Sequence, residues 1–390
     1  MKVNVVGDTH GQYHDVLKLI QLAGDPSPTN WYVFNGDFVD RGAWGVETLT
    51  VLMAWKVAHP KHVFLLRGNH ECEFCTEVYG YKRELLVKYG VQPGKALYKR
   101  FMELGAALPL AATVGSKTLV LHGGLFRGKA PRAKGGRKRA ASHALRVGTL
   151  KELAAASKGG ADPDGEGSTQ IAGDVLWSDP APDVKGLIAN DNRGIGTMFG
   201  PDATKEFMET NGIALVLRSH EGPDAREDRP EMPSVQEGFC VDHDVEGVGK
   251  LCTVFSAPDY PQFVEEGEHR HHNKAAYVVL TGGASGEEWC VPRPVSFTAV
   301  KPRPKCEPYY DITVGGSDEE GPDGDLRVEK SEESDDEDDD MDVSGPGVGG
   351  DVWEVGAGQT EMDPWEEAEA RMMMGSKTRS QTKGKAGAGR

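Results

Sequence analysis

The stretch Val3-Asn4-Val5-Val6-Gly7-Asp8-Thr9-His10-Gly11 sets the pattern of this sequence. A short apolar run, rich in β-branched residues, ends abruptly in a polar cluster that contains a carboxylate and an imidazole. Such a run is typical of a strand that is buried on both faces. The pattern recurs along the chain, where apolar runs at 31–34, 63–66, 118–121 and 214–217 each lead into a polar cluster.

Helical patterns separate the first three apolar runs. They cover residues 13–22 and 46–58. Alternation of strand and helix is typical of an α/β protein, in which ligands bind beyond the carboxyl ends of the strands. We therefore expect the polar clusters to meet at one end of the fold and to form the functional site.

The polar clusters supply six candidate metal ligands. They are Asp8, His10, Asp37, Asn69, His122 and His220. All six offer oxygen or nitrogen, a donor set that suits Mn, Fe or Zn and differs from a thiolate site. A carboxylate can bridge two ions, and Asp37 is central in the set. Two metal ions about 3.5–4 Å apart would hold a phosphoryl group and supply a hydroxide at neutral pH.

Basic side chains beside these ligands fit phosphate chemistry. Arg41 and Arg193 can each offer a bidentate guanidinium to phosphate oxygens. His70 is next to the ligand Asn69, and we predict that it is the general acid for the leaving alcohol. Asp40 could orient His70 and raise its pKa. The predicted reaction is in-line attack by a metal-bound hydroxide, with no covalent phosphoenzyme.

Eight motifs occur in a fixed order. Gly-Asp-Thr-His-Gly (7–11), Gly-Asp-Phe-Val-Asp-Arg-Gly (36–42) and Arg-Gly-Asn-His-Glu (67–71) come first, followed by motifs at 122–126, 176–180, 193–200, 218–221 and 256–260. In these motifs the chain resembles the phosphoprotein phosphatase family, the metal-dependent Ser/Thr phosphatases that include calcineurin. The resemblance covers about residues 3–314. Among subfamilies the chain is most similar to the plant type-7 phosphatases, to which residues 172–180, 218–226 and 256–263 and the long insert point.

The resemblance implies a calcineurin-like metallophosphoesterase fold, a central β-sandwich flanked by helices. It also assigns roles by position. The implied ligands of the first metal ion are Asp8, His10 and Asp37. The implied ligands of the second are Asp37, Asn69, His122 and His220, with Asp37 as the bridge. The implied catalytic pair is His70 and Asp40. The implied substrate-binding residues are Arg41, Arg193, Tyr260 and Asn69. The implied substrates are phosphoproteins.

Two rival functions stay open at this point. The first is a small-molecule phosphoesterase that acts on nucleotides or dinucleoside polyphosphates, because such enzymes share the first three motifs. The later motifs at 176–180, 218–221 and 256–260 favour the protein phosphatase. The second rival is an inactive scaffold that binds phosphoproteins or calmodulin, and a missing ligand would support it.

The charge of the chain is unevenly distributed. Of its 390 residues, 61 are acidic and 44 are basic, for a net charge of −17. Residues 317–343 alone have 15 acidic and two basic residues, so residues 1–316 are nearly neutral. This balance excludes a basic nucleic-acid binder. No apolar run approaches the ~20 residues that span a bilayer, and the start does not read as a signal peptide. We predict an intracellular protein, in the cytoplasm, the nucleus or both.

The same composition suggests two parts. We predict a catalytic domain at 1–314 and an acidic, low-complexity, disordered tail at 315–390. Within the tail, residues 353–374 could form a transient helix. Within the domain, residues 127–170 form a basic insert that we expect to be partly helical at 142–156.

The insert has three open interpretations. It could be a solvated insertion, or its Arg137-Lys138-Arg139 run could be a nuclear import signal. The type-7 resemblance implies the third interpretation, a basic amphipathic helix within 127–158 that binds calmodulin.

Four further features need interpretation. Cys72 and Cys75 form a C-x-x-C that could be a redox pair but is more typical of inert thiols. Residues 269–272, His-Arg-His-His, fit a solvated loop better than a metal tract. Asp259 stands where most relatives have Asn, and we expect altered surface contacts with catalysis retained. The first strand begins close to residue 1, whereas relatives have helices before it, so we expect either a shorter form or an incomplete start.

Overall fold

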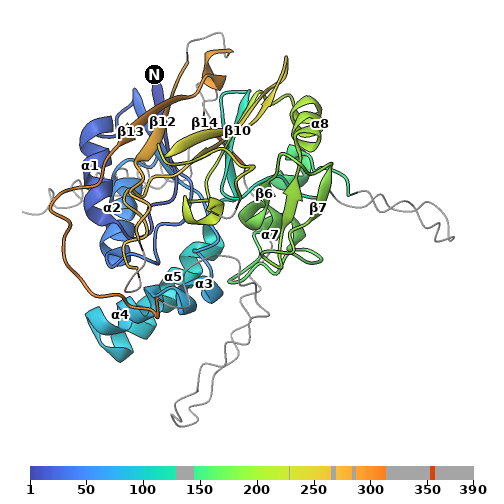
Figure 1. The fold of residues 1–390 in the computed structure, drawn as a ribbon. Helices are drawn as coiled ribbons and strands as arrows, with labels where there is room; N and C mark the ends of the chain where they lie inside the picture. The colour runs from blue at the N-terminus through green and yellow to red at the C-terminus, as the bar shows by residue number, and fades with distance from the viewer. Residues whose placement is uncertain (129–144, 228, 265–268, 283–286, 313–351, 356–390) are drawn as a thin grey trace, which may run out of the picture. The chain divides into compact units, whose positions relative to one another are not determined.

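Two β-sheets form the centre of the structure (Figure 1). The computed structural model describes residues 1–128, 145–227, 229–264, 269–282, 287–312 and 352–355. The first sheet has the strand order β13-β12-β1-β2-β3. Its strands are β1 (Lys2–Val6), β2 (Asn30–Phe34), β3 (Val63–Leu65), β12 (Ala275–Thr281) and β13 (Arg293–Phe297). β1, β2 and β3 run parallel, whereas β12 is antiparallel to β1.

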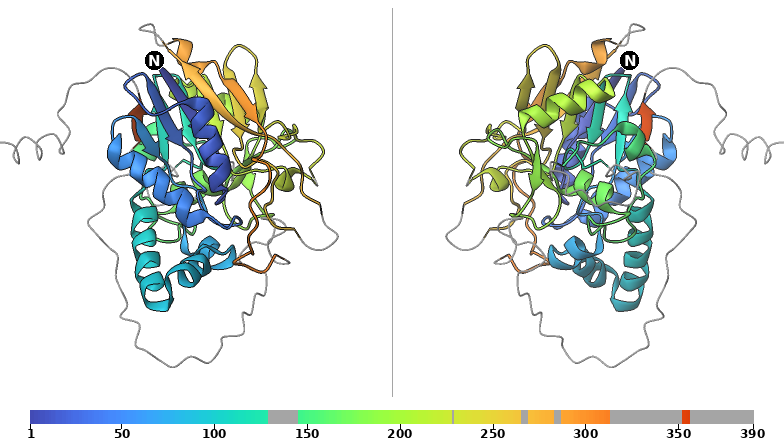
Figure 2. Two further views of the ribbon diagram at one scale, coloured as in Figure 1. Left: turned by 90° about the vertical axis from the view of Figure 1, so that its left-hand side faces the viewer. Right: turned by 90° about the vertical axis from the view of Figure 1, so that its right-hand side faces the viewer.

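The second sheet has six strands in the order β10-β11-β9-β5-β4-β14. They are β4 (Ala111–Val114), β5 (Thr118–Leu121), β9 (Leu215–Arg218), β10 (Phe239–Val245), β11 (Gly249–Val254) and β14 (Val352–Val355). β5, β9 and β11 are parallel neighbours. β14 pairs in parallel with β4 and appears in red at the edge of the sheet in Figure 2.

Alternation of side chains along the strands creates a core between the two sheets. Val3 and Val5 of β1 pack there with Leu215 and Leu217 of β9, and all four are buried. Val6 faces the other way and joins the core beneath the helices of the first sheet. Both faces of the central strands are therefore covered, which explains why their sequences read as continuous apolar runs.

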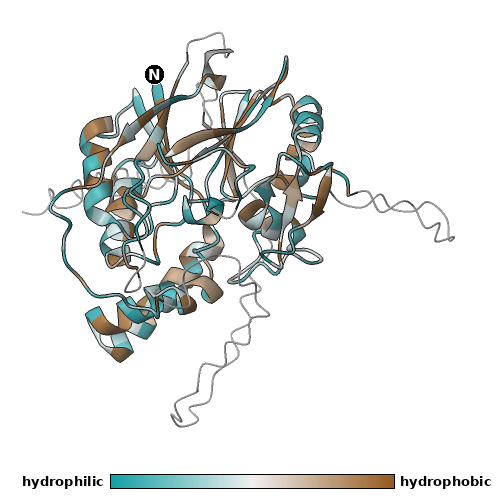
Figure 3. Ribbon diagram, viewed as in Figure 1, coloured by the Kyte–Doolittle hydropathy of each residue, from teal (hydrophilic) through white to brown (hydrophobic). Residues whose placement is uncertain are grey.

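Helices cover the outer faces of the sandwich. The first sheet is covered by α1 (Tyr13–Ala23), α2 (Gly45–Ala58), α4 (Tyr81–Tyr89) and α5 (Val91–Ala107). The second is covered by α6 (Leu150–Ala154), α7 (Gln170–Trp177) and α8 (Pro201–Asn211). Figure 3 shows both hydrophilic and hydrophobic residues on α1, as an amphipathic surface helix requires. These layers confirm the expected β-sandwich flanked by helices.

Small elements complete the described chain. A third sheet has the order β6-β8-β7, formed by β6 (Asp179–Pro180), β7 (Leu187–Ala189) and β8 (Thr197–Phe199). The helix α3 (Glu73–Val78) and the 3-10 helices η1 (Asp224–Arg226) and η2 (Glu287–Cys290) lie in connecting segments. In the described residues, no helix combines the length and apolar character needed to cross a membrane.

The expected partly helical stretch at 142–156 is shorter than predicted in its described part. Residues 145–149 are not helical, and Val147 instead forms an antiparallel bridge with Arg127. Only Leu150–Ala154 form a helix, capped by Thr149 and Glu152. Val147 and Leu153 are buried, so two apolar side chains of the supposed amphipathic face belong to the core. The run Arg137-Lys138-Arg139 lies outside the described residues.

The predicted tail is described only at Val352–Val355. These residues are an extended strand, which differs from the helix expected from residue 353 onward. The remainder of that expected helix and the acidic segment 317–343 lie outside the described residues.

Candidate active site

The ends of five central strands carry the predicted site residues. Asp8 and His10 follow β1, Asp37 and the Asp40-Arg41 pair follow β2, and Asn69 and His70 follow β3. His122 follows β5 and His220 follows β9. All of these side chains are buried. These side chains lie close to one another, so the polar clusters meet at one end of the fold.

Asp37 lies at the centre of the cluster. Its Oδ2 atom is 3.3 Å from Nε2 of His122 and 3.8 Å from Nε2 of His10. Its Oδ1 atom accepts a hydrogen bond of 2.9 Å from the backbone N–H of His70. One carboxylate therefore faces donors from three different loops, the position that a bridging ligand needs.

Asn69 faces the other two histidines. Its Oδ1 atom is 2.8 Å from Nε2 of His122 and 2.9 Å from Nδ1 of His220. The backbone N–H of His220 donates to the carboxylate of Asp8 at 3.0 Å. The six predicted ligands thus form one continuous cluster.

The chemistry of this cluster fits bound cations. Two groups of donor atoms, His10-Asp37-His70 and Asp37-His122-His220, each lie within 4.8 Å of one another. Burial, reinforced by the nearby charge of Asp37, raises the pKa of Asp8 to about 8. Two buried carboxylates that repel each other and face imidazole nitrogens are strongly stabilised by a positive ion. His70 lies within the first of these groups by distance, but its Nδ1 atom faces Asp40.

His70 and Asp40 form a buried pair. Nδ1 of His70 is 2.7 Å from Oδ2 of Asp40, and Oδ1 of Asp40 accepts the backbone N–H of Tyr81 at 2.9 Å. Burial raises the pKa of Asp40 well above its usual range. A proton shared between Asp40 and His70 satisfies both groups and fixes the ring orientation.

The site loops have an unusual backbone. Positive φ angles occur at five of the predicted site residues, namely His10, Asp37, Asp40, Arg41 and His220. Non-glycine residues rarely adopt this region, and they do so mainly where the surrounding structure enforces it. The loops also approach one another closely, since a Cβ on Gly36 would lie 2.3 Å from the backbone nitrogen of Gly68. This packing brings the Asp37 and Asn69 loops together.

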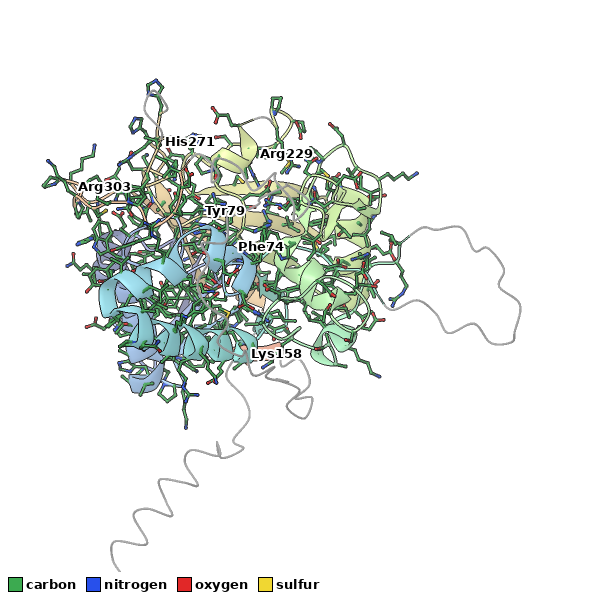
Figure 4. All side chains as sticks on the ribbon, turned by 90° about the horizontal axis from the view of Figure 1, so that it is seen from below. Phe74, Tyr79, Lys158, Arg229, His271 and Arg303 are labelled. Atoms are coloured by element: carbon green, nitrogen blue, oxygen red, sulfur yellow. The ribbon has the colours of Figure 1, made fainter. Side chains whose placement is uncertain are left out.

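Arg41 and Tyr260 lie in direct contact. Nη1 of Arg41 donates to the hydroxyl of Tyr260 at 3.0 Å and lies 3.4 Å from Oδ2 of Asp224. The guanidinium is 4.5 Å from the centroid of the Tyr79 ring, and Tyr79 lies near the centre of Figure 4, which looks at the molecule from below. Two aromatic rings and a carboxylate therefore fix the position of Arg41.

Arg193 approaches the cluster through Asp179. Its Nε atom donates to Oδ2 of Asp179 at 2.6 Å, and the other oxygen accepts from Nη2 of Arg218 at 2.9 Å. Burial alone would raise the pKa of Asp179, but Arg193 and Arg218 lower it to about 2. Because Oδ1 of Asp179 is 4.0 Å from Nε2 of His220, this network joins Arg193 to the ligand cluster.

Two supporting acids were not predicted. Asp179 is one, and Glu71 is the other. The carboxylate of Glu71 accepts the backbone N–H groups of Asp37 at 2.8 Å, Phe38 at 2.9 Å and Gly68 at 2.8 Å. It thereby ties the loop after β2 to the loop after β3. Glu71 belongs to the motif at 67–71 and Asp179 to the motif at 176–180. Their presence in these motifs is the sequence signal that could have identified them.

The remaining features have structural explanations. Cys72 and Cys75 are buried free thiols in α3 and its cap. Asp259 pairs with Arg270 at 3.1 Å and with Nδ1 of His272 at 2.8 Å, so part of the histidine-rich stretch forms ion-pair contacts. Figure 4 shows His271 and Arg303 toward the same margin of the molecule, and Arg303 lies 3.5 Å from Asp259.

Comparison with known proteins defines the family. The calcineurin-like phosphoesterase family matches residues 1–224, more than half of the chain. This chain belongs to the calcineurin-like phosphoesterase family. As a calcineurin-like phosphoesterase, it belongs to a metal-dependent group of enzymes, and the donor cluster around Asp37 agrees with that dependence.

The relatives of this calcineurin-like phosphoesterase include protein phosphatases. It is 47% identical over 328 residues to serine/threonine-protein phosphatase 7 of Arabidopsis thaliana, covering 82% of this chain and 78% of that protein. It is 36% identical to human serine/threonine-protein phosphatase 5, covering 79% of this chain. The chain spans half the length of that human relative.

A solved structure shares the fold. A protein serine/threonine phosphatase from Saccharomyces cerevisiae, described as similar to human phosphatase PP5, superimposes with a TM-score of 0.61. The two are 30% identical, and the match covers 79% of this chain and 83% of that one.

Proposed function

We propose that the protein is a metal-dependent protein serine/threonine phosphatase. The observation that carries this proposal is the placement of Asp37 between two groups of metal-ligating atoms, beside the His70–Asp40 pair and the Arg41–Tyr260 pair. Similarity to a serine/threonine-protein phosphatase over 82% of the chain supports a phosphoprotein substrate.

Six side chains would hold the metal ions. They are Asp8, His10, Asp37, Asn69, His122 and His220. The chemistry that bound Mn, Fe or Zn would supply is Lewis-acid activation of water and neutralisation of phosphoryl charge. Glu71 holds the Asp37 loop, and the backbone carbonyl of Asn35 holds the His122 ring at 2.8 Å.

The predicted substrate-binding and catalytic residues, which share Asn69 with the metal ligands, act on the substrate or position the groups that do. Arg41 and Arg193 bind the phosphate oxygens, Tyr260 positions Arg41, and the Asn69 amide lies beside the same phosphate. His70, oriented by Asp40, donates a proton to the leaving serine or threonine oxygen. Proton donation by His70 leaves the alcohol neutral and avoids a high-energy alkoxide.

The test is phosphate release from a phosphoserine peptide, with and without Mn²⁺. Asp37→Asn and His70→Asn should each lower kcat by roughly 10²–10⁴-fold. Asp25→Asn and His59→Asn, at exposed and half-buried positions away from the site, are the matched controls and should retain activity.

Four results would contradict the proposal. Full activity in EDTA would exclude the metal dependence, and full activity of His70→Asn would exclude that residue as the acid. A kcat/KM for dinucleoside polyphosphates far above that for the phosphopeptide would favour the small-molecule phosphoesterase. Absence of hydrolysis with retained phosphopeptide binding would favour the scaffold.

Calmodulin binding and subcellular location are two proposals that are independent of the phosphatase activity. The type-7 resemblance supports calmodulin binding within 127–158, although Val147 and Leu153 are buried and Leu145–Thr149 are not helical. A titration of the full chain with Ca²⁺-loaded calmodulin tests it directly. Placement in the cytoplasm or nucleus rests on the sequence alone, and imaging of a tagged full chain tests it.

A further inference from the structure

The hairpin formed by α4 and α5 is strongly basic, although the protein as a whole is acidic. Between Tyr81 and Ala107 the sequence has six basic and two acidic residues. The exposed basic side chains are those of Arg83, Lys95, Lys99 and Arg100. Lys95 and Lys99 are four residues apart, so they lie on one face of α5. The proposed active site makes no use of this charge.

The described chain reaches this hairpin just before the acidic segment begins. Tyr309 and Tyr310 pack against Gly80 at the start of α4, where an added Cβ would lie 3.2 Å from Cδ1 of Tyr310. Nζ of Lys88 is 5.9 Å from the centroid of the Tyr309 ring. Ile312 is the last described residue before the acidic segment, so that segment departs from one end of the hairpin.

The chain returns on the same, open side of the hairpin, because Tyr81 at the start of α4 lies against Phe101 in the second half of α5, with ring centroids 4.5 Å apart. Val352 of β14 pairs with Ala111, the first residue of β4. Ala111 follows the last residue of α5, Ala107, by only four positions. α5 has 17 residues and is therefore about 25 Å long. The 39 residues at 313–351 could extend to roughly 130 Å, so they can follow the whole hairpin.

The described residues on both sides of the acidic segment, up to Ile312 and from Val352, therefore lie near the basic hairpin. The segment 317–343 has a net charge of −13. Tethering at two points raises its effective concentration at the nearby surface, and attraction between opposite charges acts over about 10 Å at 0.1 M salt. We propose that the acidic segment 317–343 docks on the basic surface of the α4–α5 hairpin.

The basic insert is the competing surface, and both of its described edges contact helices of the second sheet. Nη2 of Arg127 pairs with Oδ1 of Asp174 in α7 at 2.7 Å, and the N–H of Leu150 donates to Asn211 in α8 at 2.8 Å. α7 and α8 cover the second sheet, whereas α5 covers the first. α6, at the other end of the insert, contacts β14, and Nζ of Lys158 donates to the backbone carbonyl of Ala107 at 2.8 Å. The tether at Tyr309 and Tyr310 is therefore the one that favours the hairpin.

Zero-length crosslinking of the full chain tests the proposal. A carbodiimide joins a carboxylate to an amine only when the two are in contact, and mass spectrometry identifies the pairs. Adducts between 317–343 and Lys95 or Lys99 should exceed those to Lys205 and Lys250 by about tenfold at low salt. They should fall steeply at 0.5 M NaCl, where screening shortens the range of attraction. Lys205, which is exposed, and Lys250, which is half-buried, serve as comparison amines.

A second full-length variant checks that the acidic charge is responsible. Substitution of residues 335–340 by Asn and Gln removes six of the 15 acidic residues. It should clearly lower the enrichment at Lys95 and Lys99 without lowering phosphate release at high salt. Enrichment at Lys129, Lys134 or Lys138 would overturn the proposal in favour of the insert. An even spread over all exposed lysines, or no adducts at all, would also overturn it.

Discussion

Nδ1 of His70 lies 2.7 Å from Oδ2 of Asp40, and both side chains are only 1% exposed. The second oxygen of Asp40 is held by the N–H of Tyr81, the first residue of α4. The pair is thus aligned from both sides by the fold. In this pair Asp40 is the orienting group, and His70 is the group that would transfer the proton.

Asp40→Asn tests this division of roles. The amide can still accept the Tyr81 N–H, but it cannot stabilise a positively charged His70. We expect kcat to fall roughly 10²–10⁴-fold with little change in KM or in Tm. Steady-state kinetics with a phosphoserine peptide and thermal melts measure these quantities. A kcat within twofold of the natural protein would show that Asp40 does not assist His70.

Tyr260→Phe isolates the hydroxyl that holds Arg41. The ring stays in place, but the 3.0 Å hydrogen bond from Nη1 is lost. A net loss of about 0.5–1.5 kcal/mol corresponds to a rise in KM of roughly two- to tenfold. The exposed Tyr89→Phe is the control for kinetics. An unchanged KM would mean that Tyr79 and Asp224 position Arg41 sufficiently.

Metal removal should destabilise the protein more at pH 8 than at pH 6. In the metal-free state, burial raises the pKa of Asp8 from 3.8 to about 8. A carboxyl whose folded pKa is raised stabilises the fold at low pH, and that contribution is lost as pH rises through about 8. Thermal melts in EDTA at both pH values, with Mn²⁺ added back, measure the effect. Asp8→Asn should reduce the pH dependence of the EDTA penalty, and an unchanged dependence would contradict this origin.

His243 should make the protein acid-sensitive independently of the metal site. Burial lowers the pKa of His243 to about 4 from 6.5, and its Nδ1 contacts the Thr204 hydroxyl at 2.8 Å. Its folded pKa is depressed, so stability present above pH 6.5 is lost as pH falls towards 4, by about 3 kcal/mol. His243→Asn should flatten the curve of unfolding free energy against pH in this window. His59→Asn serves as the control, and equal slopes for the two variants would refute the assignment.

Asp259→Asn should affect stability more than catalysis. The carboxylate pairs with Arg270, His272 and Arg303, all partly or largely exposed. Such pairs contribute about 0.2–1 kcal/mol each, so Tm should fall by a few degrees. Asn also tolerates the positive φ of this position. Phosphatase kinetics should stay within about twofold, and a large loss of kcat would give Asp259 a role in the site.

The sequence predicts the six metal ligands because each one follows a recognisable strand. Asp8, Asn69 and His122 could be placed in this way, since parallel strands end at a common edge. The roles of Glu71 and Asp179 could not, because they depend on which backbone N–H groups and guanidinium groups meet them across loops. A motif identifies the acidic residue, but only the three-dimensional structure shows which groups it binds.

The insert and the tail show a different limit. Val147, Leu150 and Leu153 have helical spacing, yet a β-bridge at Val147 keeps it out of the helix, which begins only at Leu150. β14 lies within a low-complexity sequence, and its strand exists through pairing with β4. Local composition contains no information about such a distant partner.

The pairing of Val3 with Leu280 has a consequence for synthesis of the protein. β1 is translated long before its antiparallel neighbour β12, which follows some 270 residues later. The loop that contains Asp8 and His10 therefore lacks the support of the β1–β12 pairing until most of the chain has been translated. Contacts of such sequence separation slow folding and expose intermediates. The need for chaperones during translation would then depend on the time between the synthesis of β1 and the synthesis of β12.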